Sequence, residues 1–279
     1  VENKEHFLKE RMLFDVTLFS DGSNIQRKPK GHLYLYPLIA IAAMLAIVFV
    51  MDLPHMHKPK QQLSQTIRIP AGQRAQMDLP DGSIVWLNSQ TTLTYDENFG
   101  KKDRKVTLDG EAYFEVAHNK EIPFYVQTEN IKVQVTGTKF DVCSYKGSNS
   151  FIARLIEGSI NLLTNNAKEE KPITSLTKGK YFSMENGKYK TGEMSSNNAL
   201  AWMQGIYYFD DVPFKELLDK IALYYNYKIT VKNPKILENY RCTGKFKDLD
   251  GIEHILKVIQ KDHPFKYNID NEHNKITIE

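Results

Sequence analysis

A run of nineteen residues without a charged side chain, LYLYPLIAIAAMLAIVFVM at positions 33–51, most constrains what this chain can fold into. A helix rises about 1.5 Å per residue, so the run reaches about 28 Å, close to the hydrocarbon thickness of a bilayer. It lacks the polar face of a helix on a soluble protein's surface, and it begins too late for a secretory signal. The pattern predicts one transmembrane helix, at residues 33–53. The alternative interpretation is a helix buried on all sides in the core of a soluble protein.

The predicted helix divides the chain into a short segment, residues 1–32, and a much longer part after it. The first residue is Val1 rather than Met, which indicates that the short segment is the remainder of a longer domain. Basic residues flank the helix on both sides, at 27–30 and 58–68, so the positive-inside rule does not orient it.

The composition is that of a globular protein, with 41% hydrophobic and 25% charged residues. A formal net charge of +3 is too small to indicate a nucleic-acid partner. Cys143 and Cys242 are either free thiols or one disulfide, and the sequence does not decide. His55 and His57 have no third ligand nearby, so we expect no metal site and no cofactor.

A polar, proline-containing tether is predicted at residues 54–65, followed by a β-rich domain at 66–194. Alternating apolar residues indicate many short strands, and Pro80-Asp81-Gly82 and Asn186-Gly187 indicate hairpin turns. This pattern is typical of a sandwich, a barrel or a β-solenoid. The strands are expected at 73–79, 83–88, 105–108, 112–116, 122–128, 131–136, 139–145, 151–157, 159–163 and 181–184.

Helical spacing begins only near residue 195. Phe214, Leu217, Leu218, Ile221 and Tyr225 predict one amphipathic helix, capped by Asp210 or Asp211. Ile252, Ile255, Leu256 and Ile259 predict a second helix. With short strands between them, the order is β-α-β and then β-α-β-β, in a small domain at residues 195–279. The predicted fold class is α+β, mainly β, with one transmembrane helix.

Two carboxylates, Glu111 and Glu115, lie four residues apart on a predicted strand. Their Cα atoms are then about 13 Å apart, too far for the carboxylate pair of a glycosidase. We therefore expect them to be surface residues or local hydrogen-bond acceptors. The sequence contains no nucleophile elbow, zinc-binding helix or phosphate-binding loop, so we predict that the protein is not an enzyme.

Gly137-Thr138 interrupts the alternation between two predicted strands. One interpretation is a structural β-bulge glycine. The other is self-cleavage: with glycine in a strained or positive-φ conformation, the Thr138 hydroxyl attacks the Gly137 carbonyl in an N→O acyl shift that cuts the chain.

Several motifs in order resemble the FecR family, single-pass regulators that transmit iron-citrate-type signals to extracytoplasmic-function sigma factors. The motifs, which extend from residue 66 to about 190, are Pro70-Ala71-Gly72-Gln73, Leu79-Pro80-Asp81-Gly82-Ser83, Val85-Trp86-Leu87-Asn88-Ser89, Leu108-Asp109-Gly110-Glu111-Ala112-Tyr113-Phe114-Glu115-Val116, Pro123-Phe124, Val135-Thr136-Gly137-Thr138-Lys139-Phe140-Asp141-Val142 and Glu157-Gly158-Ser159. Residues 195–279 are similar to the secretin and TonB short amino-terminal domain that follows in the Bacteroidota members.

The resemblance implies a topology and partners. Residues 1–32 would lie in the cytoplasm and hold a sigma factor, although only residues 6–19 show apolar spacing for a helix. Residues 33–53 would cross the inner membrane in contact with lipid, and both later domains would lie in the periplasm. There they would receive a signal from the signalling domain of a TonB-dependent outer-membrane transducer. Some members of the family self-cleave at a Gly-Thr pair.

Partner contacts are expected on the small carboxyl-terminal domain, through exposed strand edges and aromatic side chains. The aromatic candidates are Trp202, Tyr207, Tyr208 and Tyr240, with core packing as the alternative role. A different class of function stays open, a membrane-anchored periplasmic carbohydrate-binding or envelope scaffold protein. A membrane-tethered hydrolase lacks any catalytic constellation. The inducing ligand cannot be inferred from the sequence.

Overall fold

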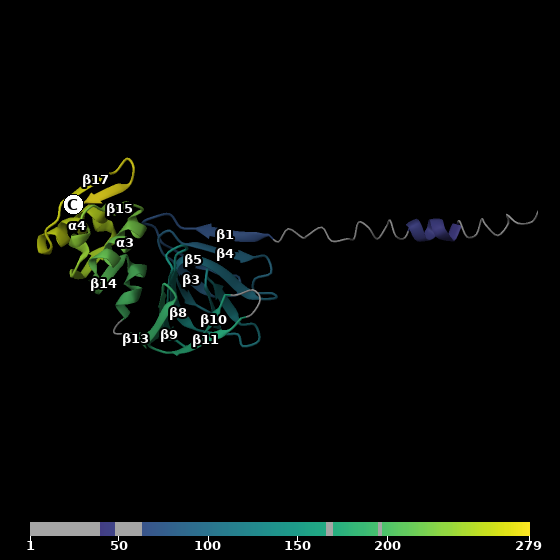
Figure 1. The fold of residues 1–279 in the computed structure, drawn as a ribbon. Coiled ribbons are helices and arrows are strands. Elements are labelled where there is room, and N and C mark those ends of the chain that lie inside the picture. Colours follow the sequence, from purple (N-terminus) through teal and green to yellow (C-terminus); the bar gives the residue numbers. More distant parts are fainter. Residues whose placement is uncertain (1–39, 48–62, 166–169, 195–196) are drawn as a thin grey trace, which may run out of the picture. The chain divides into compact units, whose positions relative to one another are not determined.

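A computed structural model describes residues 40–47, 63–165, 170–194 and 197–279 (Figure 1). The chain forms two compact units, residues 1–61 and 62–279. In the first unit, residues 40–47 are an exposed helix. Among the described residues, no helix combines the length and the apolar character that crossing a membrane requires.

Most of the predicted membrane helix, all of the segment 1–32 and most of the tether lie outside the described residues. These assignments and the domain boundaries stay predictions. The first strand begins at Ser64, inside the predicted tether.

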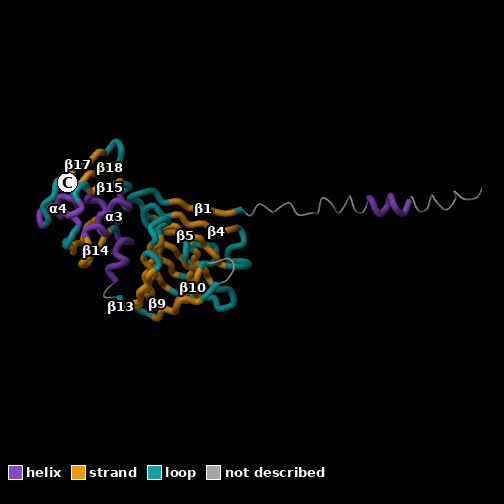
Figure 2. Tube along the Cα trace, in the orientation of Figure 1, coloured by secondary structure: helices purple, strands orange, loops and turns teal. Residues whose placement is uncertain are grey.

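Thirteen strands of the described residues form one curled sheet in the second unit (Figure 2). The prediction of a mainly β fold is therefore confirmed. Four strands, β1, β4, β11 and β13, are additional to the expected ranges, and β13 follows the predicted Asn186-Gly187 turn. The thirteen strands are β1 (Ser64–Arg68), β2 (Ala75–Asp78), β3 (Ile84–Leu87), β4 (Thr92–Asp96), β5 (Arg104–Glu115), β6 (Phe124–Gln127), β7 (Ile131–Val135), β8 (Lys139–Ser144), β9 (Ser150–Glu157), β10 (Ser159–Thr164), β11 (Pro172–Thr177), β12 (Lys180–Glu185) and β13 (Lys188–Glu193).

The long strand β5 joins the two halves of this sheet. Its first half pairs with β4 and β6, and its second half pairs with β3 and β8. At the bend Gly110 has φ +136°, and a Cβ there would lie 2.4 Å from Thr91 Oγ1. Glycine therefore lets the strand bend without ending, and the expectation of two separate strands at 105–108 and 112–116 is wrong.

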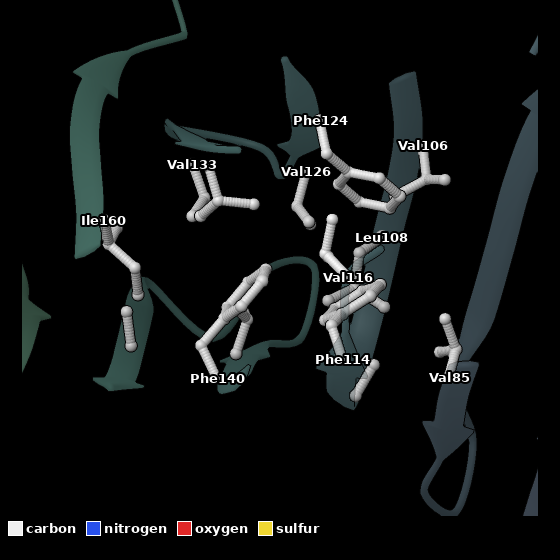
Figure 3. Packing of buried hydrophobic residues seen from close by; sticks show 14 of the residues in the cluster. Val85, Val106, Leu108, Phe114, Val116, Phe124, Val126, Val133, Phe140 and Ile160 are labelled. Atoms are coloured by element: carbon white, nitrogen blue, oxygen red, sulfur yellow. The ribbon is translucent and has the colours of Figure 1, made fainter. Parts of the chain in front are cut away.

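The two halves of the sheet enclose one hydrophobic core (Figure 3). Phe124 of one half lies 5.9 Å from Phe114 of the other, and Phe114 stacks on Phe140 at 5.1 Å, measured between ring centroids. All three rings are fully buried. Burial of each such side chain contributes about 1.5–3 kcal/mol, so this core stabilises the curled sheet.

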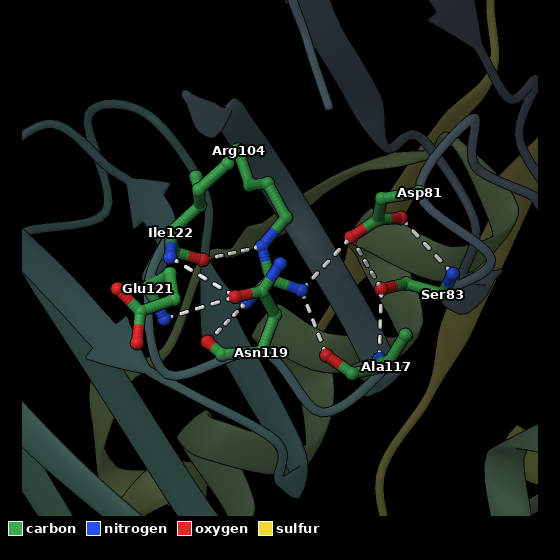
Figure 4. A network of polar contacts seen from close by, with 7 residues as sticks. All are labelled: Asp81, Ser83, Arg104, Ala117, Asn119, Glu121 and Ile122. Carbon is green, nitrogen blue, oxygen red and sulfur yellow. Dashed lines mark hydrogen bonds and ion pairs between the residues drawn. The ribbon is translucent and has the colours of Figure 1, made fainter. Parts of the chain in front are cut away.

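The turn Pro80-Asp81-Gly82 joins β2 to β3, as expected, and a buried arginine attaches it to β5 (Figure 4). The Arg104 guanidinium donates to Asp81 Oδ2 at 3.2 Å. Asp81 also accepts from the Ser83 hydroxyl at 2.8 Å and from its backbone N–H at 3.0 Å. Arg104 donates further to three carbonyl oxygens, those of Ala117 (2.7 Å), Asn119 (3.0 Å) and Ile122 (2.7 Å).

The carboxyl-terminal region follows the predicted order, β-α-β and then β-α-β-β. Strands β14 and β16 form one antiparallel pair, while β18 pairs in parallel with β15 and antiparallel with β17. The elements are η3 (Asn197–Gln204), β14 (Ile206–Pro213), α3 (Phe214–Tyr225), β15 (Lys228–Val231), η4 (Pro234–Leu237), β16 (Arg241–Lys247), η5 (Asp248–Asp250), α4 (Gly251–Asp262), β17 (Tyr267–Asp270) and β18 (Lys275–Ile278).

Helix α3 differs from its prediction in two details. Strand β14 continues to Pro213, and neither Asp210 nor Asp211 caps the helix. Asp211 instead has φ +48° and pairs with Arg241 at 2.7 Å, in a bulge of the β14–β16 pair. On the apolar face, Tyr224 rather than Tyr225 is buried.

Candidate functional site

The outer face of β5, β8 and β9 contacts the carboxyl-terminal region, and we call this contact the seam. Along β5, Ala112 and Phe114 point into the sheet core, while Tyr113 belongs to the hydrophobic cluster of the carboxyl-terminal region. Half-buried Trp86 on β3 packs on the same cluster, 5.5 Å from Tyr113 between ring centroids. Trp202 of η3 is a buried member of it. The seam therefore has an aromatic layer built from both regions.

Beside the aromatic layer lies a buried charged network. Arg154 of β9 donates to Asp141 Oδ2 on β8 at 2.6 Å, and its guanidinium lies 3.8 Å from Glu111 Oε1 on β5. Asn88 Nδ2 donates to Glu111 Oε2 at 2.6 Å. The Asp141 side chain is fully buried and that of Glu111 is 6% exposed. Two buried carboxylates thus share one arginine.

Burial and the shared arginine set the protonation of this network. Burial and then the Asp141 carboxylate raise the pKa of Glu111 from 4.5 to about 7, against the opposing effects of Arg154 and Asn88. Burial also raises the pKa of Asp141, although Arg154 opposes the shift. Burial raises the pKa of the neighbouring Cys143 thiol well above its ordinary range. Glu111 therefore changes charge near neutral pH.

A partly open cavity of about 270 Å³ lies next to the network, between the two regions. Glu111, Cys143 and Arg154 line it from the sheet, and Trp202, Tyr207, Tyr208 and Lys220 are among the residues that line it from the other side. Within the described residues, no group of three or more His, Cys, Asp and Glu side chains is arranged to hold a metal ion.

The carboxyl end of α3 docks on loops of the sheet region. The Tyr224 carbonyl accepts from the Gly72 N–H and from the Ser89 hydroxyl, each at 3.0 Å, and Gln90 Nε2 donates to the Leu223 carbonyl. The last carbonyls of a helix lack regular partners within the helix. The Asn226 N–H donates to the Leu223 carbonyl at 3.3 Å, and the sheet region supplies the further donors. Each such hydrogen bond contributes about 0.5–1.5 kcal/mol net.

A salt bridge adds to these contacts, with Arg74 Nη2 lying 2.7 Å from Asp248 Oδ2. Arg74 precedes β2, and Asp248 begins η5. The seam therefore combines hydrogen bonds, ion pairs and apolar packing.

Three of the four predicted partner-binding aromatic residues lie at the seam. Trp202 and Tyr207 are each 4% exposed, so they contact the protein itself. Tyr208 is half-buried at the cavity. Tyr240 stacks on His263 at 3.9 Å and lies away from the cavity. Trp202 and Tyr207 are thus core-packing residues, and partner binding at Tyr208 and Tyr240 stays a prediction.

Of the two paired glutamates, Glu111 is a buried hydrogen-bond acceptor, and the expectation of a surface position is wrong for it. The region that covers it begins with η3 at Asn197, far along the chain, and alternation along one strand does not reveal such a contact. Glu115 is half-buried, accepts from the Tyr113 hydroxyl at 3.3 Å and pairs with Lys139. Cys143 and Cys242 are both free.

Sequence reasoning did not single out Asp141 and Arg154. A signal was available, because Asp141 alternates with the buried residues Phe140 and Val142, and Arg154 alternates with Ala153 and Leu155. Opposite charges on neighbouring strands indicate a cross-strand pair. What alternation does not show is that this outward face is covered.

Gly137 does not have a positive φ, which excludes one of the two conformations considered for it, and self-cleavage stays a prediction. Glycine is required there for space, because a Cβ would lie 2.4 Å from His118 Nδ1. Thr138 is 4% exposed, and its hydroxyl donates to the Ser159 carbonyl at 3.0 Å. The β8–β9 register shift between Lys139 and Phe140 places a bulge next to the pair.

Self-cleavage at this bond predicts two fragments from the purified full chain, separated after Gly137. It predicts one intact band for Thr138→Ala, because the attacking hydroxyl is gone. Electrophoresis and intact mass measure both. A single band of full mass from the wild-type chain would contradict self-cleavage and leave the pair a structural role.

Comparisons with known proteins assign this fold to a family. A family model described as FecR protein matches residues 65–161, and one described as FecR, C-terminal, matches residues 206–278. The chain belongs to the FecR family. The seam of this FecR-family chain thus lies between its two matched segments.

Solved structures agree on the fold of this FecR-family chain. Two crystal structures of a candidate anti-sigma factor from Parabacteroides distasonis ATCC 8503 are similar, each with 24% identity and a TM-score of 0.66. The alignment covers 77% of this chain and 98% of that one. A search of curated protein sequences finds no match.

Proposed function

We propose that this protein is an inner-membrane anti-sigma factor and signal transducer. In this proposal residues 1–32 hold an extracytoplasmic-function sigma factor in the cytoplasm, residues 33–53 cross the membrane, and residues 62–279 receive a signal in the periplasm. The signal comes from the signalling domain of a TonB-dependent outer-membrane transducer. The observation that carries the proposal is the match of both FecR family segments on one chain that also contains an uncharged run of nineteen residues.

The carboxyl-terminal region offers edges for the transducer. Strands β15 and β17 each pair with β18 and with no other strand of the described residues. An added strand from a partner would satisfy the free backbone groups of such an edge. This is the mode of docking that we propose.

Two routes would pass the signal to the cytoplasm. The partner could shift an existing equilibrium between conformations of the receiving regions by binding one of them more tightly. Alternatively, it could release a segment for proteolysis and so free the cytoplasmic piece with its sigma factor. A single helix transmits a hinge motion poorly, so we favour proteolysis. Accumulation of a shortened membrane fragment on inducer addition is the expected result, and full-length protein throughout activation would contradict this route.

Co-purification from the native cell tests the proposed function. The full chain, extracted in mild detergent, is expected to capture a sigma factor that mass spectrometry identifies. The matched control lacks residues 1–32 and is expected to capture none, because the sigma-holding segment is gone. Absence of a sigma factor from the full-chain sample would contradict the proposal, and glycan binding in that case would favour a carbohydrate-binding scaffold instead.

A further inference from the structure

Polar atoms without a well-formed hydrogen bond gather at the seam. Among the described residues, four buried side-chain polar atoms have no hydrogen bond of standard geometry, and three of them belong to seam residues: Arg74 Nη1, Asp141 Oδ1 and Trp202 Nε1. The Trp202 indole lies close enough to Asp141 to lower its pKa as a hydrogen-bond donor, but the pair does not have standard hydrogen-bond geometry. Buried polar groups usually make well-formed hydrogen bonds, and those of the seam make weaker ones.

The cavity points to the same conclusion. The pocket of about 270 Å³ between the two regions is partly open, so solvent already reaches one side of the seam. Water can also replace the hydrogen bonds that close the seam. The Leu223 and Tyr224 carbonyls lie at a helix end, and water hydrates the freed ends of a helix readily.

The charged network partly opposes the contact between the sheet and the carboxyl-terminal region. Asp141 and Glu111 are buried beside one guanidinium, and desolvation of two carboxylates against a single positive charge is unfavourable. The Arg154 guanidinium therefore offsets part of the desolvation cost of these carboxylates. Without Arg154, exposure of both carboxylates to water would be favourable, and the seam would open more readily.

We propose that the seam is a releasable joint: the docked end of α3 holds the carboxyl-terminal region on the sheet, Arg154 neutralises the sheet carboxylates that this region covers, and separation of the two regions is the change that the receiving part undergoes on signalling. This inference rests on the proposed function for its signalling role. The joint itself is a property of the chain alone, so it can be tested without a sigma factor or a transducer.

The chain contains a built-in reporter of this joint. Its two tryptophans, Trp86 on the sheet and Trp202 on η3, belong to the same seam cluster. Separation would expose both indole rings to solvent. Acrylamide quenching of tryptophan emission therefore measures seam opening, and far-UV circular dichroism of the same sample measures whether the fold is kept.

The test compares three variants of the full chain in mild detergent. Arg154→Met is expected to raise the acrylamide quenching constant several-fold, and Ser89→Ala, which removes a seam hydrogen bond and leaves no charge unpaired, is expected to raise it less. Lys132→Met is the matched control. Lys132 lies on β7, outside the seam, and the substitution removes its ion pair with Glu170, so this variant should be quenched like the wild-type chain.

If the Arg154→Met chain keeps its circular dichroism signal and its acrylamide quenching constant equals that of the wild-type chain, the proposal is overturned. If Arg154→Met loses its circular dichroism signal, Ser89→Ala decides: raised quenching with an intact fold supports the joint, and unchanged quenching overturns it. Sigma-factor capture is scored separately. A chain that captures a sigma factor and shows no opening contradicts the joint alone, while a chain that opens and captures none contradicts the proposed function alone.

Discussion

Arg104→Met is expected to lower the free energy of unfolding by about 3–5 kcal/mol, because it leaves a carboxylate buried without its positive partner. The Arg104 and Asp81 side chains are 3% and 5% exposed, so water cannot replace the lost contact. Three carbonyl oxygens lose their donor in the same change. Urea unfolding of the full chain, followed by far-UV circular dichroism, measures the effect.

A second substitution separates the charge from the packing. Asp81→Asn combined with Arg104→Met removes the uncompensated charge, so the double variant is expected to be more stable than Arg104→Met alone. Lys215→Met is the control, since its pair with Asp219 is exposed at both ends and such pairs contribute little. An Arg104→Met chain as stable as this control would show that the network of Figure 4 does not hold the turn.

Stability is expected to fall by about 3 kcal/mol as the pH rises from about 4.5 to about 8, through the raised pKa of Glu111. That pKa is raised by burial and by Asp141 from 4.5 to about 7, so between these values the folded chain keeps a proton that the unfolded chain has lost. Stability then decreases with pH. The contribution is fully present below pH 4.5 and is lost as the pH passes through 7. The raised pKa of Asp141, also caused by burial, acts in the same direction.

Glu111→Gln isolates this effect, because glutamine keeps an oxygen that accepts from Asn88 and does not ionise. Its unfolding free energy, measured from pH 4.5 to 8, should lack the Glu111 decrease and exceed that of the wild-type chain above pH 7. Glu115→Gln, on the same strand and partly exposed, is the control for loss of a carboxylate elsewhere on β5. Identical slopes for Glu111→Gln and the wild-type chain would contradict the assignment of this titration to Glu111.

Local signals in the sequence predict the elements of this fold well. Alternation locates most of β2 to β12, and the spacing of apolar residues locates both helices of the carboxyl-terminal region. The Asn186-Gly187 signal corresponds to the β12–β13 hairpin, where both residues have positive φ. The predicted strand bounds are wrong where a single residue changes the backbone geometry. Gly110, for example, bends β5 without ending it.

The site was not predictable in the same way, because it depends on contacts between distant segments. Tyr113 and Glu111 face outward on β5, and one strand's alternation assigns such residues to solvent. Only the docking of α3 and η3 buries them. The same covering explains why Trp202 and Tyr207, candidates for partner contact with core packing as the alternative, are packed inside the seam.

Two-sided labelling tests the central claim, that one chain works in two aqueous compartments, most directly. In a background with Cys143→Ser and Cys242→Ser, one chain carries Ser20→Cys and another carries Tyr189→Cys, at a side chain that is 70% exposed. Cells with a permeabilised outer membrane are treated with a membrane-impermeant maleimide. We predict labelling of the Tyr189→Cys chain before lysis and of the Ser20→Cys chain only after it. Equal labelling of both chains before lysis would contradict the account.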